Sequence, residues 1–332
     1  MTIDNVFIGF ENTYCPENVI KSAMINNEPL EEKLNVIIVV SNPCNYMRRY
    51  KLAKEFVERI EKYNSDNVNL YVVELAYDNQ KYALTEPNNP NHLQLHSTTV
   101  LWHKENMINV GIKKLLPEDW KAVAWIDADI EFENLSWPID TLKILNGSRD
   151  FVQLFSHAID MDKDCNTMSI FSGFGYQYMH NKKYKKFGND FWHPGFAWAF
   201  TRNAYEKLGG LYDLSILGSG DHYMALSLLQ FAKLLFSKNA HYNYTDSINE
   251  YQKNALSLRL GYVPGVIKHY YHGSKKNRQY SDRYKILDSF QYDPYNHVTK
   301  NDIGLLVPTK TFPQGLKHAI MNYFQERNED EE

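Results

Sequence analysis

The strongest constraint on the fold is a continuous run of β-branched residues, Val-Ile-Ile-Val-Val at positions 36–40, which ends in Ser41 and Asn42. A strand that is apolar on both faces is typical of a parallel sheet covered by helices on both sides. Two similar runs follow at residues 70–75 and 122–126, separated by segments with apolar residues at helical spacing, residues 48–63 and 100–116. This alternation predicts an α/β domain with a mixed, mainly parallel sheet flanked by helices.

The rest of the chain is patterned less regularly. Residues 1–34 are interpreted as an N-terminal extension with one short strand at residues 6–10, and the polar stretch around Pro87 and Pro90 as a loop. Further elements are expected as strands at residues 151–155 and 195–200, helices at residues 201–208 and 221–236, and an extended segment at residues 263–271. The acidic residues 326–332 predict a frayed end.

Composition narrows the function classes. A chain of 332 residues is expected to form one large domain or two fused halves, and its hydrophobic share of 43% is sufficient for a buried core. The net charge of −4, from 36 basic and 40 acidic side chains, argues against general nucleic-acid binding. The 3 cysteines form no paired motif, which argues against a zinc ribbon or a disulfide framework. With no signal-peptide pattern and no apolar run near the roughly 20 residues that span a bilayer, a cytoplasmic protein without a membrane span is expected.

Two carboxylates follow the third predicted strand. Asp127 and Asp129 come directly after residues 122–126, at the edge of a parallel sheet where ligands usually bind. Hard oxygen ligands with open positions suit Mn²⁺ or Mg²⁺ bridged to a diphosphate. The alternative is a turn whose carboxylates cap backbone amides. The same spacing at residues 160–164 lacks the glycine and glutamate of a calcium loop, and is interpreted as a solvated turn.

A glycine-rich turn places an acid at the start of the predicted helix 221–236. Asp221 follows Gly218-Ser-Gly and precedes His222. A carboxylate at this position suits an N-cap, and it also suits a general base that takes a proton from an acceptor hydroxyl. Both interpretations stay open, since one side chain can serve both roles.

A third segment combines histidines with basic residues. His269 and His272 precede Lys275, Lys276 and Arg278. Histidine nitrogens can complete a metal site begun by carboxylates, and the basic side chains can hold phosphates. The alternative is a solvated basic loop.

In this order, the segments resemble glycosyltransferases of the GT-A (Rossmann-like) fold, and most closely the β-1,4-galactosyltransferase family. Residues 104–111 are similar to a basic helix of that family that ends in Asn-Val-Gly, and residues 125–130 resemble its metal motif. Residues 195–221, with the glycine turn, resemble its acceptor and base region, and residues 272–278 resemble its closing loop. The resemblance covers about residues 36–290.

The resemblance implies a UDP-sugar donor, a carbohydrate or glycoconjugate acceptor, Mn²⁺ (or Mg²⁺) and transfer with inversion. It implies Asp129 and His272 as metal ligands, Asp127 near the ribose and the metal, and Asp221 as general base. His269 stands where the family has another metal ligand. The remaining donor-binding residues are expected to be Ser41, Asn42, Glu74, Lys104, Lys275, Lys276 and Arg278.

The acceptor side departs from the family pattern. An acid precedes the base in the family, whereas Gly220 precedes it here. The aromatic run 191–198 is expected to bind the acceptor through Trp192, His193 and Gly195, together with His222, unless its rings belong to the core. Residues 35–135 are therefore expected to bind the nucleotide sugar, residues 136–290 to bind the acceptor and carry catalysis, and residues 291–332 to form a C-terminal tail.

Three alternative functions remain open at this stage. A retaining GT-A enzyme would share the fold and the metal. A sugar nucleotidyltransferase would release pyrophosphate, although the early glycine-rich basic loop favoured by that chemistry is missing. A non-catalytic sugar-binding module would bind UDP with a metal and show no turnover.

Overall fold

The computed structural model describes residues 2–3, 6–7 and 16–331, except 187, 189, 280 and 281. Within this part of the chain the main sheet has 7 strands in the order β12-β8-β11-β6-β3-β4-β5. These are β3 (Leu34–Ser41), β4 (Val68–Tyr77), β5 (His92–Ser97), β6 (Ala122–Ile126), β8 (Phe151–Gln153), β11 (Ala197–Thr201) and β12 (Leu260–Tyr262). Neighbouring strands are parallel except β11, which is antiparallel to β6 and β8. The predicted mixed, mainly parallel sheet is confirmed.

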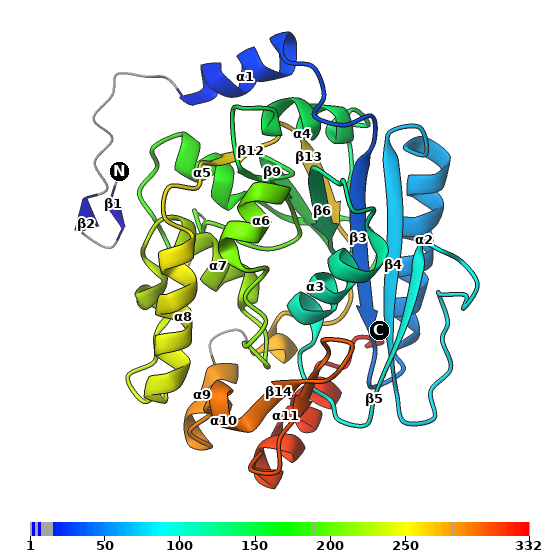
Figure 1. Cartoon of the computed structure of the whole chain (residues 1–332), viewed down its shortest axis with the longest axis vertical. Coiled ribbons are helices and arrows are strands. Elements are labelled where there is room, and N and C mark those ends of the chain that lie inside the picture. The colour runs from blue at the N-terminus through cyan, green and yellow to red at the C-terminus, as the bar shows by residue number, and fades with distance from the viewer. Residues whose placement is uncertain are drawn as a thin grey trace.

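Helices cover both faces of this sheet because its central strands are apolar on both sides. On β3, Val36 and Ile38 belong to the same buried cluster as Phe56 of α2 (Met47–Tyr63). Ile37, which points to the opposite face, belongs to a second cluster with Met107 of α3 (Lys104–Leu115). Figure 1 shows α2 and α3 on opposite sides of β3 and β4.

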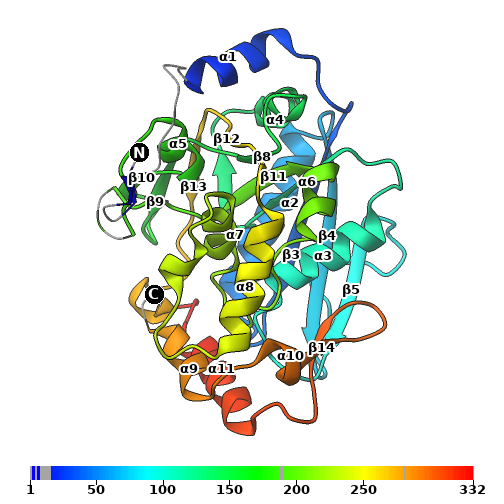
Figure 2. The same ribbon diagram turned by 60° about the vertical axis from the view of Figure 1, so that its left-hand side comes forward.

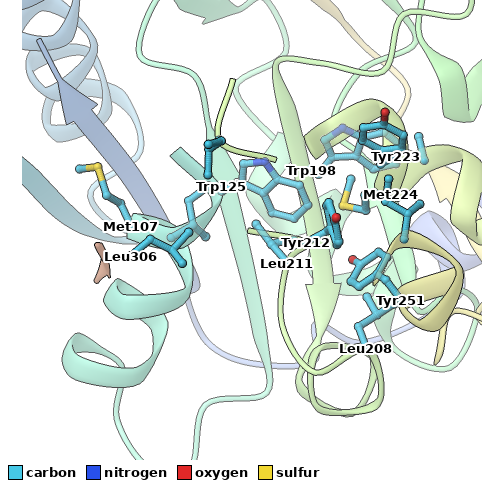
Figure 3. Packing of buried hydrophobic residues seen from close by; sticks show 14 of the residues in the cluster. Met107, Trp125, Trp198, Leu208, Leu211, Tyr212, Tyr223, Met224, Tyr251 and Leu306 are labelled. Carbon is cyan, nitrogen blue, oxygen red and sulfur yellow. The ribbon is translucent and has the colours of Figure 1, made fainter. Parts of the chain in front are cut away.

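Aromatic side chains fill the second cluster (Figure 3). Trp125 of β6 and Trp198 of β11 are paired in register, and their rings stack with centroids 6.4 Å apart. Phe151 of β8 meets Trp198 edge to face at 5.6 Å. Trp198, from the aromatic run 191–198, therefore belongs to the core, and its side chain is fully buried.

A smaller sheet joins segments that are far apart in the sequence. Its order is β10-β9-β13-β7, formed by β7 (Ile130–Phe132), β9 (His157–Met161), β10 (Thr167–Ser172) and β13 (Val266–His269). His269 lies opposite Ile130 on one side and opposite Asp160 on the other. Since Ile130 directly follows Asp129, the register of this sheet brings the predicted metal ligands together.

The remaining helices surround the two sheets. They are α1 (Pro16–Asn26), α4 (Trp137–Leu145), α5 (Phe174–Met179), α6 (Arg202–Leu208), α7 (Gly220–Leu228), α8 (Tyr242–Asn254), α9 (Arg283–Ser289), α10 (Pro294–His297) and α11 (Gln314–Glu326). Two short antiparallel strand pairs lie outside these sheets. They are β1 (Thr2–Ile3) with β2 (Val6–Phe7), and β14 (Val298–Lys300) with β15 (Leu306–Pro308). In Figures 1 and 2, α9 to α11 gather at the end of the molecule opposite α1.

Several sequence expectations require correction. The apolar helix expected at residues 221–236 ends at Leu228, because Gln230 adopts a left-handed conformation with φ 62°. The stretch around Pro87 and Pro90 is a loop as expected, but it leads into β5, a strand that the sequence pattern did not predict. Of the end expected to be frayed, the described residues 326–331 pack against the rest of the chain, and Glu329 is 1% exposed. Of the strand expected at residues 6–10, β2 is present and residues 8–10 lie outside the described residues.

No helix among the described residues is long and apolar enough to cross a lipid bilayer.

Candidate active site

A cavity of about 650 Å³ lies beyond the carboxyl ends of β3 and β6. Parallel strands deliver their carboxyl-terminal side chains to one edge of a sheet, and the small sheet and α7 supply the opposite walls. The predicted site residues that line this cavity are Ser41, Lys104, Asp127, Asp129, His193, Gly195, Asp221, His222, His269, His272, Lys275 and Arg278. Most of the predicted site is therefore brought together in one place.

Three side chains in this cavity form a candidate metal centre. Ligand atoms of Asp129, His269 and His272 all lie within 4.8 Å of one another. His272 Nε2 is 2.8 Å from Asp129 Oδ2, and the Nε2 atoms of the two histidines are 3.2 Å apart. Asp129 Oδ1 is buried without a hydrogen-bond partner among the described residues. One carboxylate and two imidazoles with a buried orphan oxygen fit a divalent cation.

The protonation of His269 can be assigned from its partner Asp160. His269 Nδ1 is 2.6 Å from Asp160 Oδ1. Burial opposes ionisation of Asp160, but hydrogen bonds from His269 and Lys275 prevail and lower its pKa to about 2. An ionised carboxylate can only accept, so Nδ1 of His269 carries the proton. Burial also lowers the pKa of His269, which keeps the ring neutral and leaves a lone pair on Nε2.

The electrostatics of Asp129 support an ionised ligand. Burial by itself would raise the pKa of this carboxyl, but His272, His269 and Arg278 outweigh burial and hold the pKa below its ordinary value. Asp129 is thus expected to present a full negative charge to a cation.

Asp127 differs from the expectation of a metal ligand. Its carboxylate forms an ion pair with Lys104 from the first turn of α3, and it is not part of the three-residue cluster. Burial raises the pKa of Asp127, while Lys104 acts in the opposite direction. Burial disfavours the charge on Lys104, but Asp127, Asp221 and Glu105 prevail and raise the pKa of the ammonium group. Lys104 therefore stays protonated beside the acids of the cavity and offsets part of their negative charge.

Asp221 is positioned by the first turn of α7. It is the second residue of the helix, not its N-cap, because Ser219 occupies the cap position. Its Oδ1 accepts a hydrogen bond from the backbone of His222 at 2.8 Å, and a Cβ at Gly195 would lie 3.1 Å from its Oδ2. Gly195 thus leaves open the space beside one carboxylate oxygen. The N-cap interpretation is wrong, whereas a base role is compatible with this geometry.

The basic residues of the 275–278 segment have different environments. Lys275 Nζ is 2.5 Å from Asp160 Oδ2, and Arg278 is 8% exposed with Nη2 3.4 Å from the carbonyl oxygen of His272. Both line the cavity, but Lys276 is exposed and does not. The expectation that Lys276 contacts the donor is not supported, since its side chain is exposed and does not line the cavity.

The expected role of Asn42 and Glu74 in donor binding requires correction, because neither residue lines the cavity. The Asn42 side chain closes the turn before α2, with Oδ1 accepting from Tyr46 N and Nδ2 donating to Tyr46 O, each at 2.9 Å. The buried Glu74 carboxylate accepts backbone hydrogen bonds from Ala83, Leu84 and Thr85, and a fourth from the Thr85 hydroxyl. Both side chains anchor loops.

The expected role of Trp192 in acceptor binding also requires correction, because its side chain is fully buried. Its ring packs edge to face on Phe174, and its Nε1 donates a hydrogen bond to Lys183 O at 3.2 Å. The neighbouring His193 does line the cavity, stacked on Phe196 at 4.3 Å. His222 lies 3.0 Å from the Tyr184 hydroxyl. Burial lowers the pKa of each of these two histidines to about 3, so both rings are neutral.

Several residues of the cavity were not expected from the sequence. They are Arg49, Trp102, Glu105, Asp160, Arg327 and Glu329. The sequence pattern Asp-Met-Asp at residues 160–162 predicted a solvated turn. The prediction is correct for Asp162, which is half-exposed, and wrong for Asp160, which is 2% exposed. No local pattern marks Glu329, since its acidic surroundings are typical of a solvated tail.

Comparison with known proteins adds little beyond the architecture. No protein-family model matches the chain, and no curated protein matches it. Among solved structures, the chain is similar to the catalytic domain of Drosophila β1,4-galactosyltransferase 7, solved in complex with xylobiose. The identity is 9%, the alignment covers 84% of this chain and 95% of that chain, and the TM-score is 0.40. Similarity of this degree says nothing about the reaction, which has to be inferred from the side chains of the cavity.

Proposed function

We propose that this chain is a metal-dependent glycosyltransferase that moves a sugar from a UDP-sugar to an acceptor hydroxyl with inversion. The proposal rests on one observation: the Asp129, His269 and His272 cluster shares a single cavity with Asp221. A metal-binding cluster and a separate carboxylate in one cavity are the two components that direct displacement of a diphosphate requires.

In this mechanism Asp221 accepts the proton of the acceptor hydroxyl. The hydroxyl oxygen forms a bond to the anomeric carbon while the bond from that carbon to the diphosphate oxygen breaks, and UDP leaves. A divalent cation, Mn²⁺ or Mg²⁺, held by Asp129, His269 and His272, would neutralise charge on the departing diphosphate. Gly195 leaves room for the acceptor beside Asp221 Oδ2.

Charged residues around the cation site would complete the donor pocket. Lys104, Lys275 and Arg278 all line the cavity, and we expect their positive charges to hold the nucleotide and its diphosphate. Ser41, whose hydroxyl lies 2.9 Å from that of Tyr77, is proposed to contact the nucleoside. The donor pocket thus combines residues 35–135 with His269 and His272, while His193, Gly195 and His222 face the acceptor.

The test is a panel of UDP-sugars assayed for release of UDP, with Mn²⁺, with Mg²⁺ and with a chelator. Asp129→Ala is expected to abolish the metal-dependent reaction, and Asp162→Asn serves as a control because this half-exposed side chain lies outside the cavity. The anomeric configuration of the product distinguishes inversion from retention. Metal-independent turnover, or turnover unchanged in Asp129→Ala, would refute the proposed function.

A further inference from the structure

Each histidine of the candidate metal centre is backed by a buried carboxylate from a distant part of the chain. We propose that Asp160 and Glu329 are positioning residues that aim Nε2 of His269 and Nε2 of His272 at one cation, so that the C-terminal segment (residues 327–331) is part of the metal centre. This inference rests on the proposed function only in requiring that the cluster binds a divalent cation.

Of the two carboxylates, Asp160 makes the shorter contact with its histidine. It sits on β9 opposite His269 on the parallel neighbour β13, so both side chains point to the same face of the small sheet. Its Oδ1 holds His269 Nδ1 at 2.6 Å, and Lys275 Nζ lies 2.5 Å from Oδ2. A carboxylate on the far nitrogen of a ligating histidine fixes the tautomer and orientation of the ring and raises its basicity.

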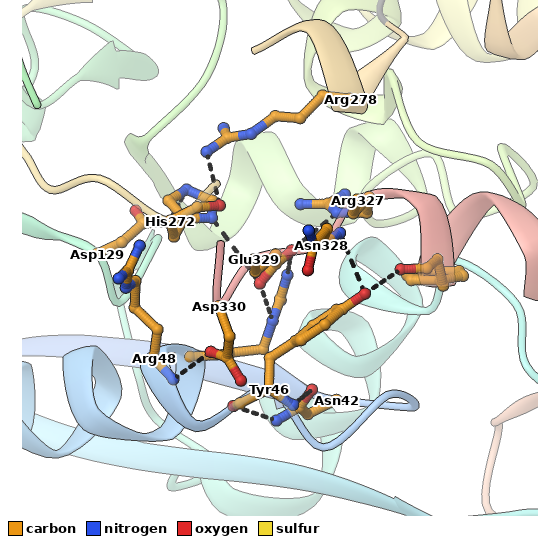
Figure 4. Close-up of polar contacts among 12 residues, drawn as sticks. Asn42, Tyr46, Arg48, Asp129, His272, Arg278, Arg327, Asn328, Glu329 and Asp330 are labelled. Carbon is orange, nitrogen blue, oxygen red and sulfur yellow. Dashed lines mark hydrogen bonds and ion pairs between the residues drawn. The ribbon is translucent and has the colours of Figure 1, made fainter. Parts of the chain in front are cut away.

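Glu329 occupies the corresponding place behind His272, with Oε2 3.9 Å from Nδ1. It is 1% exposed, accepts a hydrogen bond from Arg49 Nε at 2.9 Å, and accepts another from Arg327 Nε at 2.8 Å. A buried carboxylate with two guanidinium partners is held firmly in place. Figure 4 shows Glu329 between Arg327 and the His272 ring, with Asp129 on the other side of that ring.

The C-terminal segment is docked by a specific set of contacts. Asp330 accepts hydrogen bonds from the backbone N–H groups of Met47 and Arg48, each at 2.9 Å, at the start of α2. Asn277 donates to Glu331 at 3.0 Å, and a Cβ at Gly273 would lie 3.0 Å from the carbonyl oxygen of Arg327. The segment therefore bridges the start of α2 and the loop that carries His272.

The position of the proton on the His272 ring gives a reason for a carboxylate behind this histidine. Its Nε2 lies 2.8 Å from Asp129 Oδ2, where it donates a hydrogen bond to the carboxylate. A cation at Nε2 requires a lone pair there, so the proton of a neutral ring must reside on Nδ1. Nδ1 faces Glu329, whose Oε2 lies 3.9 Å away, so a small movement of the ring or the carboxylate brings this proton within hydrogen-bond distance. Both histidines then present Nε2 lone pairs towards Asp129.

The experiment measures the affinity of the full-length chain for Mn²⁺ alone by isothermal titration calorimetry. Asp160→Asn and Glu329→Gln are expected to bind Mn²⁺ about 10- to 100-fold more weakly than wild type, the range typical of lost partners of metal-ligating histidines. Asp162→Asn removes a charge from the same strand end as Asp160, and Glu326→Gln removes one from the exposed helix end just before the C-terminal segment. Neither side chain touches either histidine, and both variants are expected to bind as wild type does.

Affinities of Asp160→Asn and Glu329→Gln equal to those of their controls would overturn the inference. Failure of the wild-type chain to bind Mn²⁺ would instead refute the proposed function, so the two failures are distinguishable. Because Glu329→Gln leaves the buried Arg327 and the half-buried Arg49 without their carboxylate, a second measurement uses the wild-type chain: amide hydrogen exchange of residues 327–331. Metal binding and docking of this segment must reinforce each other, so Mn²⁺ is expected to slow this exchange, and unchanged exchange would overturn the role of Glu329.

Discussion

Glu74 provides a sharp test, because the sequence analysis expected it to bind the donor, whereas in the structure its carboxylate anchors a loop. In Glu74→Gln one carboxylate oxygen becomes an NH₂ group. If the remaining oxygen keeps the bonds from Leu84 and Thr85, the NH₂ group faces the backbone N–H of Ala83, a donor against a donor. The variant therefore loses one charge-assisted hydrogen bond and weakens three others.

The expected loss of stability follows from these contacts. A hydrogen bond to a charged group contributes about 1.5–3 kcal/mol and one between neutral groups about 1 kcal/mol. Since Ala83 is exposed, its freed N–H finds water, which reduces the total. We expect Glu74→Gln to lower the free energy of unfolding by about 2–4 kcal/mol, with Mn²⁺ and UDP affinities of the folded protein unchanged.

The assay is urea denaturation at pH 7 with Glu86→Gln as the matched control, because Glu86 is an exposed acid in the same loop. The control is expected to change the free energy of unfolding by less than about 0.5 kcal/mol. If Glu74→Gln were as stable as wild type but bound UDP more weakly, Glu74 would be a donor-binding residue and the assignment as an anchor would be refuted.

Three further predictions concern catalysis, the core and pH. Asp221→Asn keeps an acceptor oxygen for the backbone of His222, so it is expected to fold and to bind Mn²⁺ normally while kcat falls about 10²- to 10⁴-fold; a kcat equal to that of wild type in single-turnover kinetics would exclude Asp221 as the base. Trp192→Ala is expected to cost about 3–5 kcal/mol of folding stability in urea denaturation because the ring is fully buried, and a stable variant with altered acceptor preference would contradict that assignment. Burial lowers the pKa of His103 from 6.5 to about 4, so the unfolded chain takes up a proton first and stability falls as the pH drops from 6.5 to 4, by at most about 1.4 kcal/mol per pH unit. Urea titrations across that range should show a shallower pH slope in His103→Gln, and an equal slope would refute the assignment.

Local patterns in the sequence predicted much of the donor half. The apolar runs that became β3, β4 and β6 predicted a parallel sheet, and strand polarity then indicated where Ser41, Asp127 and Asp129 would emerge. These inferences succeeded because a strand that is apolar on both faces has few alternatives, and because its end fixes the position of the next side chain. The family resemblance implied His269 and His272 as metal ligands, and in the structure they lie together with Asp129 in a cluster that could hold a metal ion.

Other features depend on partners that the sequence does not place. Asn42, Glu74 and Trp192 are residue types suited to ligand binding. In the folded chain Asn42 stabilises a turn and Glu74 anchors a loop through hydrogen bonds, while Trp192 is buried in the core. Whether a polar side chain meets a ligand or a backbone amide depends on which segment packs against it.

The sequence alone determined the type of sheet and where Asp127 and Asp129 would emerge, because both follow from short-range periodicity. That Asp221, His269 and His272 would join them was implied by the family resemblance. The tertiary structure decided which of those groups meet and what lies behind them. Asp160 and His269 are 109 residues apart in the sequence, and they become neighbours only through the register of the small sheet. Glu329 reaches His272 only because its segment folds back onto the start of α2. Such pairings depend on long-range packing, and no local pattern encodes them.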